Sequence, residues 1–185
     1  MRRCTSNTRS TRRSRMAGFT IVELLITMLL AAILAGIAVP SFRGMIANNR
    51  LTTQANDFVG AINFARSAAI TRNMTITFCR AAAATDTACA TADDPWAAWI
   101  VRNAAGEVLR NGAIEDFSGT VQVTSDLNDQ TLEFRADGLA RTGGSVVADR
   151  IISVCTTADI TSNFRSLTLG AGSRVTTTKS AGTCS

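Results

Sequence analysis

A single carboxylate, Glu23, lies in an otherwise apolar run that extends from Phe19 to Val39. A helix of that length rises about 32 Å, which is enough to cross the hydrocarbon core of a bilayer. An ionised side chain in a membrane helix costs about 2.5–3.5 kcal/mol at the centre and less near the edge. In a helix that only anchors the chain nothing would offset this unfavourable free energy, so we expect Glu23 to pair with a positive group.

The cysteines are the second group of residues that could do chemistry. Cys4 precedes the apolar run, and four more cysteines follow it: Cys79, Cys89, Cys155 and Cys184. Four cysteines allow three disulfide pairings, among which the sequence alone does not choose. We favour Cys79–Cys89 and Cys155–Cys184, because each pair encloses a contiguous loop. A metal centre is not expected, because the chain has no C-x-x-C spacing and no histidine.

Enzymatic activity is the competing class of function, and the sequence offers little support for it. Histidine and tyrosine are absent, so the commonest general base is missing and a nucleophilic cysteine lacks its usual partner. No nucleophile elbow and no P-loop occurs. The acidic pairs Asp93–Asp94 and Glu115–Asp116 lie in polar, loop-like stretches, where solvation is the default expectation. We therefore predict no catalytic residue, no cofactor and no metal.

The chain begins with a basic segment. Residues 1–18 contain no acidic residue and six arginines, which are Arg2, Arg3, Arg9, Arg12, Arg13 and Arg15. Without this segment 13 basic residues stand against 14 acidic ones, so the net charge of +5 becomes about −1. The high overall isoelectric point is therefore no sign of a nucleic-acid partner. The arginines instead indicate that residues 1–18 stay in the cytoplasm and that the C-terminal domain is exported, which permits disulfides.

The apolar run is expected to continue as a longer helix. Gly36 and Pro40 interrupt it, since a proline in a helix interior removes a hydrogen bond and kinks the axis. The alternative is that Pro40 simply ends the membrane helix. Continuation is favoured by an apolar stripe with spacings of three and four residues, formed by Leu51, Ala55, Phe58, Ile62, Ala65 and Ala69. This stripe is expected to pack on a sheet.

Beyond Asn73 the period changes to the alternation typical of strands. Strands are expected at 74–79, 97–102, 107–110, 120–124, 131–135, 145–154, 164–169 and 174–178. Turn signals separate them at 103–106, 111–112, 137–138 and 143–144. Residues 81–94 are expected to form a loop held by Cys79 and Cys89. Short strands with close turns predict antiparallel pairing, so the fold class is α+β, with one long N-terminal helix packed on antiparallel sheet.

The residues Gly18, Phe19, Thr20, Glu23 and Leu24 resemble the prepilin leader and N-terminal helix of the type IV pilin superfamily. The resemblance implies that a prepilin peptidase cuts after Gly18 and methylates the new N-terminus at Phe19. It also implies that Glu23 pairs with the N-terminal amine of a neighbouring subunit during assembly, and that Pro40 lies where the helix can bend. The alternative is a Sec signal peptide or an ordinary signal anchor. In a Sec signal peptide the apolar region precedes the cleavage site, which is a small-residue cut.

A second resemblance, to the GspH/FimT family, spans roughly residues 16–184. It is carried by the stretches 49–52, 65–70, 72–74, 96–101 and 134–138, with the sequences NRLT, ARSAAI, RNM, WAAWIV and FRADG. Core packing is the preferred role of Trp96 and Trp99. Arg66 is expected to fix the junction between helix and sheet and not to bind a ligand.

Two functions occur within that family. One is a minor pilin of the FimT/FimU kind, which primes or joins a type IV pilus. The other is a minor pseudopilin of type II secretion. The paired cysteines and residues 38–42 are more similar to the pilus branch. The implied partners are the prepilin peptidase, other minor and major pilins or pseudopilins, and the inner membrane.

DNA capture is a third hypothesis, since some FimT-like pilins bind DNA through a C-terminal G-R-x-R motif. The nearest match is the stretch 172–176, with Arg174 inside it and Lys179 downstream. A serine is inserted, and a threonine stands where the second arginine would be. One or two cations neutralise few phosphates, so a solvated arginine at a strand end is the preferred interpretation.

The domain organisation predicted from these arguments has three parts. Residues 1–18 form a cleaved cytoplasmic leader, and residues 19–42 form the transmembrane and assembly helix. Residues 43–185 form a periplasmic pilin domain. The expected location is the inner membrane, with a single pass and a periplasmic C-terminal domain, and then the pilus or pseudopilus.

Overall fold

The computed structural model describes residues 18–91, 95–114 and 120–184 of the 185-residue chain. The chain forms two compact units, Met1–Pro40 and Ser41–Ser185. Apart from Gly18, the predicted leader lies outside the described residues, and so do the acidic pairs 93–94 and 115–116.

The first unit contains the beginning of the long helix α1, which covers Ile21–Arg72. Thr20 caps this helix, because its hydroxyl accepts a hydrogen bond of 3.2 Å from the amide of Glu23. Among the residues that the structure describes, no helix is both long and apolar enough to cross a membrane. Membrane insertion of residues 19–39 therefore stays a prediction.

The helix continues through Pro40, as the apolar stripe beyond it predicts. The alternative that Pro40 ends the helix is wrong, since Gly36 and Pro40 both have helical backbone, and a kink at Pro40 stays a prediction. A proline lacks the amide that would donate to the carbonyl four residues earlier, here that of Gly36. The loss of one such bond leaves the rest of the 52-residue helix intact.

Asn73 ends the helix, at the position where the sequence pattern changes. Its φ of 50° lies in the left-handed region, which asparagine tolerates better than most residues. The amide of Met74 donates to the carbonyl of Ala69 at 3.3 Å, and the amide of Asn73 donates to that of Ile70 at 3.4 Å. These two bonds form a Schellman motif that satisfies the last carbonyls of the helix.

The first sheet has six antiparallel strands in the order β3-β2-β1-β5-β6-β7 within the described part of the chain. Its strands are β1 (Ile76–Ala81), β2 (Ala98–Asn103), β3 (Val108–Ala113), β5 (Thr131–Phe134), β6 (Ala140–Thr142) and β7 (Ser145–Val146). A short 3₁₀ turn, Asn128–Gln130, precedes β5.

The second sheet has four antiparallel strands in the order β10-β9-β8-β4, again counted over the described residues. Its strands are β4 (Val121–Ser125), β8 (Arg150–Thr156), β9 (Phe164–Gly170) and β10 (Arg174–Ser180), with a 3₁₀ turn at Ala171–Ser173. A backbone bond of 2.9 Å from Trp96, just before β2, to Val123 of β4 links the two sheets.

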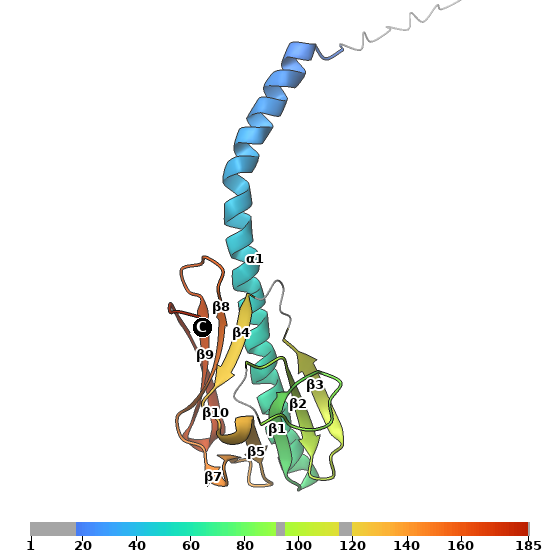
Figure 1. The fold of residues 1–185 in the computed structure, drawn as a ribbon, viewed down its shortest axis with the longest axis vertical. Coiled ribbons are helices and arrows are strands. Elements are labelled where there is room, and N and C mark those ends of the chain that lie inside the picture. The colour runs from blue at the N-terminus through green and yellow to red at the C-terminus, as the bar shows by residue number, and fades with distance from the viewer. Residues whose placement is uncertain (1–17, 92–94, 115–119, 185) are drawn as a thin grey trace, which may run out of the picture. The chain divides into compact units, whose positions relative to one another are not determined.

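Within the C-terminal unit, strands of both sheets lie beside α1 (Figure 1) and share one hydrophobic core with it. All six residues of the predicted stripe are at most 1% exposed, so the packing of this helix face on the sheets is confirmed: Leu51, Ala55, Phe58, Ile62, Ala65 and Ala69. The α+β class and the antiparallel pairing are confirmed as well.

Three details of the predicted strands are wrong. Asn111 and Gly112 do not form a turn but lie inside β3, where Gly112 pairs with Trp99. The stretch 145–154 is two strands in different sheets, because Asp149 has a φ of 58° and breaks the extended backbone. The short strand β6 was not expected, because its sequence Ala-Arg-Thr has no apolar alternation.

Candidate functional site

Glu23 lies in the first turn of α1, four positions after Phe19, the residue that would carry the N-terminal amine after cleavage. The hydroxyl of Thr20 already caps this turn, so the carboxylate is not needed for that purpose. Among the described residues, no hydrogen bond or ion pair is found for the Glu23 side chain, and Phe19 is 80% exposed. Pairing of this carboxylate with a second chain stays a prediction.

Both predicted disulfides are present. Cys79 of β1 is bonded to Cys89 in the following loop, with 5.6 Å between the Cα atoms. Cys155 of β8 is bonded to Cys184 near the C-terminus, with 5.7 Å between the Cα atoms. The two bonds fix the loop after β1 and the segment after β10.

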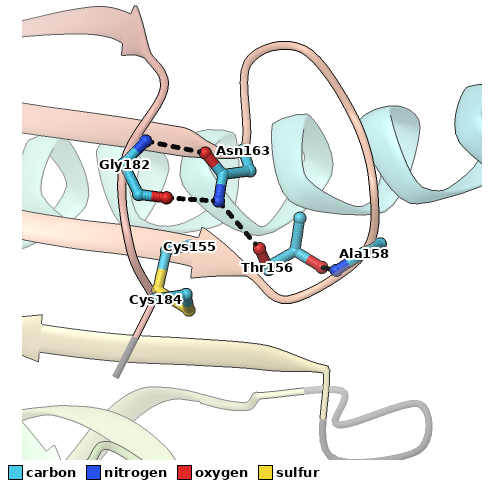
Figure 2. Close-up of a disulfide and its surroundings, with 6 residues drawn as sticks. All are labelled: Cys155, Thr156, Ala158, Asn163, Gly182 and Cys184. Carbon is cyan, nitrogen blue, oxygen red and sulfur yellow. Dashed lines mark hydrogen bonds between the residues drawn. A yellow bond between two sulfur atoms is a disulfide. The ribbon is translucent and has the colours of Figure 1, made fainter.

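Asn163 holds the same C-terminal segment through hydrogen bonds (Figure 2). Its side-chain amide donates to the carbonyls of Gly182, at 2.9 Å, and Thr156, at 3.2 Å. Its side-chain oxygen accepts from the amide of Gly182 at 3.0 Å. The C-terminus is therefore attached by one covalent bond and by a two-way hydrogen-bond clamp, and the clamp was not expected from the sequence.

The tryptophans and Arg66 have the structural roles expected of them. Trp96 and Trp99 are each 3% exposed and pack with Phe58 and Phe78, with ring centroids 5.5–6.4 Å apart. The indole of Trp96 donates to Gln130 at 2.9 Å. Arg66 of α1 donates to the carbonyl of Ser173 at 3.2 Å, which ties the helix to the turn before β10.

The two residues named for DNA contact, Arg174 and Lys179, lie on β10 and are exposed. Because they are five positions apart on one strand, they point to opposite faces and are separated by about 17 Å along it. The strand does not bring them together into one phosphate site. DNA contact at these residues stays a prediction, and its support is the sequence pattern alone.

The structure also contains a buried cation that the sequence did not reveal. Arg165 of β9 is 1% exposed. Burial lowers the pKa of its guanidinium. Neutral acceptors surround it: the carbonyls of Ser162 and Phe164 and the side chains of Asn48 and Thr52. This arrangement joins α1 to β9.

In the described part of the chain, no cluster of histidine, cysteine or acidic residues could hold a metal ion.

Two crystal structures of the type IV minor pilin FimU from Pseudomonas aeruginosa, strain PAO1, are similar to this chain. One is 17% identical and covers 69% of this chain and 91% of FimU, with a TM-score of 0.47. The other is 19% identical and covers 70% of this chain and 88% of FimU, with a TM-score of 0.49. No curated protein matches the sequence.

Two protein-family models match the chain in succession. Residues 13–39 match the prokaryotic N-terminal methylation motif, which includes Gly18, Phe19 and Glu23. Residues 54–177 match the family described as type II transport protein GspH. The families imply a structural subunit that assembles with other pilins or pseudopilins. Because the second match covers more than half of the 185 residues, this chain belongs to the GspH family of pilin-like proteins.

Proposed function

We propose that this chain is a minor subunit of a type IV pilus that helps to prime its assembly. It is made as a precursor, cut after Gly18 by the prepilin peptidase and methylated at Phe19. The inner membrane holds residues 19–39 until the subunit enters the fibre, while the domain that follows lies in the periplasm. The observation that carries the proposal is the methylation motif at residues 13–39, directly before the GspH match.

Glu23 sets the axial position of the subunit in this proposal. Its carboxylate attracts the N-terminal amine of a neighbouring subunit, and the pair lies among packed helices, where charges interact more strongly than in water. Removal of one member of such a pair leaves the other charge uncompensated, which is strongly unfavourable. The cap formed by Thr20 keeps the first turn helical whether or not Glu23 is charged.

The decisive variants are Glu23→Gln and Glu23→Ala in cells that assemble the fibre. Both are expected to be cleaved and to remain in the membrane fraction, but to fall to a small fraction of the wild-type level in sheared fibres. The matched control is Asp159→Asn, which removes an exposed carboxylate of the C-terminal unit. Normal incorporation of Glu23→Gln would exclude the proposed charge pair.

Processing has its own measurement. The mass of the mature chain should equal that of residues 19–185 with a methyl group on Phe19 and two disulfides. A Gly18→Asp variant should accumulate as precursor and stay out of the fibre. A mature protein that begins elsewhere would contradict cleavage after Gly18.

A pseudopilin of type II secretion is the second candidate, and the description of the matching family favours it. The two disulfides and the residues 38–42 favour the pilus. A deletion strain distinguishes the two when surface pili and secreted proteins are measured together. Loss of pili with normal secretion supports the pilus, whereas loss of secretion with normal pili supports the pseudopilus.

A further inference from the structure

A cavity of about 660 Å³ lies in the C-terminal unit, between one face of α1 and the strands β2, β3 and β4. The helix contributes Asn49, Arg50, Gln54 and Asp57, and the strands contribute Trp99 and Arg110 among others. Its volume lies within the range of about 300–1,000 Å³ that is typical of ligand sites. None of the roles assigned above uses this cavity.

Two residues that line the cavity each have a buried side-chain donor with no hydrogen-bond acceptor among the described residues. The donors are the side-chain nitrogen of Gln54, a residue 7% exposed, and the indole nitrogen of Trp99, a residue 3% exposed. Buried polar groups are normally hydrogen-bonded, so an unpaired donor needs an explanation. Trp96 makes the contrast clear, because its indole, equally buried, donates to Gln130. The two unpaired donors indicate a ligand that supplies acceptor oxygens.

The charge of the lining favours an acidic ligand. The guanidinium of Arg110 lies 5.8 Å from the ring centre of Trp99 and 5.9 Å from that of Phe64. Both contacts hold it beside the helix face. Among the described lining residues, Arg50 and Asp57 carry opposite charges, so Arg110 makes the net charge of the lining positive. Arginine is the residue best suited to carboxylate recognition, because its planar group donates two parallel hydrogen bonds.

The form of the ligand follows from the strands beside the cavity. β3 is one of the two edge strands of the first sheet, and β4 is one of the two edge strands of the second. Among the described residues, each is paired with a strand on one side only. Edge strands have backbone groups that an extended peptide can pair with, and strand addition is a common form of peptide recognition.

We propose that this cavity binds an extended, acidic peptide segment of a neighbouring subunit. The identity of the partner as a subunit rests on the proposed function, whereas the peptide chemistry rests on the cavity alone. Carboxylates of the segment accept hydrogen bonds from Arg110, and its carbonyl oxygens accept from Gln54 and Trp99. Gly112 keeps the site in shape, because a Cβ atom there would lie 2.4 Å from the indole of Trp99.

The test uses the full-length chain, labelled with ¹⁵N, in detergent micelles. The probe is an acetylated and amidated pentapeptide that alternates valine and glutamate, and its control replaces both glutamates by glutamine. The chain has two tryptophans, so two indole N–H signals are expected in the NMR spectrum. The Trp99 signal should shift downfield with the acidic peptide, while the Trp96 signal, already hydrogen-bonded to Gln130, should stay in place.

Binding by two arginine variants tests whether the peptide binds at this cavity and not elsewhere on the chain. Arg110→Gln should weaken binding of the acidic peptide about tenfold, as expected for the loss of one hydrogen bond to a charged group. The matched control Arg174→Gln, on the exposed strand β10, should bind like the wild type. An unchanged Trp96 signal in each variant shows that the core is intact.

Three results would overturn the proposal: no shift of Trp99 with the acidic peptide, an equal shift with the glutamine peptide, or a shift only with a thymidine oligonucleotide. The last result would identify a nucleic-acid site. None of these outcomes depends on fibre assembly, whereas the Glu23 variants test assembly without altering the cavity. Failure of one proposal is therefore distinguishable from failure of the other.

Discussion

The guanidinium of Arg165 on β9 donates a hydrogen bond to the side-chain oxygen of Asn48 on α1, although 117 positions separate the two residues. The charge is buried and is surrounded by neutral oxygens. Burial of a cation is unfavourable unless hydrogen bonds replace its hydration. Asn48 is therefore a structural partner that the buried arginine requires, and the bond joins α1 to the second sheet.

Asn48→Ala tests this relationship. The variant leaves a donor of a buried charged group unpaired, so the free energy of unfolding should fall by about 1.5–3 kcal/mol. The neighbouring exposed residue gives the control, since Asn49→Ala should change it by less than about 0.5 kcal/mol. Urea unfolding followed by tryptophan fluorescence measures both. Equal effects of the two variants would contradict the role of Asn48.

Gly112 and Gly170 form a second matched pair. A Cβ atom at Gly112 would lie 2.4 Å from the indole of Trp99. A Cβ atom at Gly170 would have no heavy atom of the described residues within 4 Å, apart from its own chain neighbours. Gly112→Ala should displace the indole and lower the free energy of unfolding by about 1–3 kcal/mol, as overpacking does. Gly170→Ala should be neutral or slightly stabilising. A native Trp99 indole signal in Gly112→Ala would contradict the close packing.

Asp137 makes the free energy of unfolding depend on pH in the acidic range. Hydrogen bonds from Arg141 and from the amide of Leu139 lower the pKa of Asp137 from 3.8 to about 2. Because the folded pKa is the lower one, the contribution is complete above about pH 4 and is lost as the pH falls toward 2.

The measurement is the difference in melting temperature between the wild type and Asp137→Asn from pH 5 to pH 2. This difference should shrink through that window. Asp159→Asn, which also removes one exposed carboxylate, is measured in parallel as the control for the change in net charge. A difference that stays constant down to pH 2 would show that the pair with Arg141 does not stabilise the fold.

The disulfides should differ in their effect on stability. The separation is 29 residues for Cys155–Cys184 and 10 for Cys79–Cys89. Loop-closure entropy then gives about 3.6 and 2.7 kcal/mol, respectively. The Cys155→Ser/Cys184→Ser double variant should therefore unfold at lower urea than the Cys79→Ser/Cys89→Ser double variant. The reverse order would show that local packing outweighs chain entropy.

Much of the fold could be predicted because its signals are local. The apolar stripe of α1 has the helical period, and the change of period near Asn73 coincides with the Schellman motif. The disulfides present are the pairing that was favoured for its contiguous loops, although the sequence alone leaves three pairings open. Glu23 could be singled out because a charge in an apolar run is rare.

The remaining features depend on contacts between distant segments. Gly112 resembles a turn residue in sequence, but the indole of Trp99 is what requires glycine there. Arg165 lies on the buried face of β9 with Leu167 and Leu169, and the sequence pattern there indicated only a strand. Its partner Asn48 lies on the helix. The cavity has no sequence signal, because α1 and three strands contribute its walls.

The disulfide between Cys155 and Cys184 also determines which part of the chain bears a mechanical pulling force. A load applied between α1 and the C-terminus passes from β8 directly through the sulfur atoms and bypasses β9 and β10. The segment between the two cysteines, which are 29 positions apart, would otherwise extend by about 100 Å and is therefore shielded from force. Stretching experiments should detect this length only after reduction.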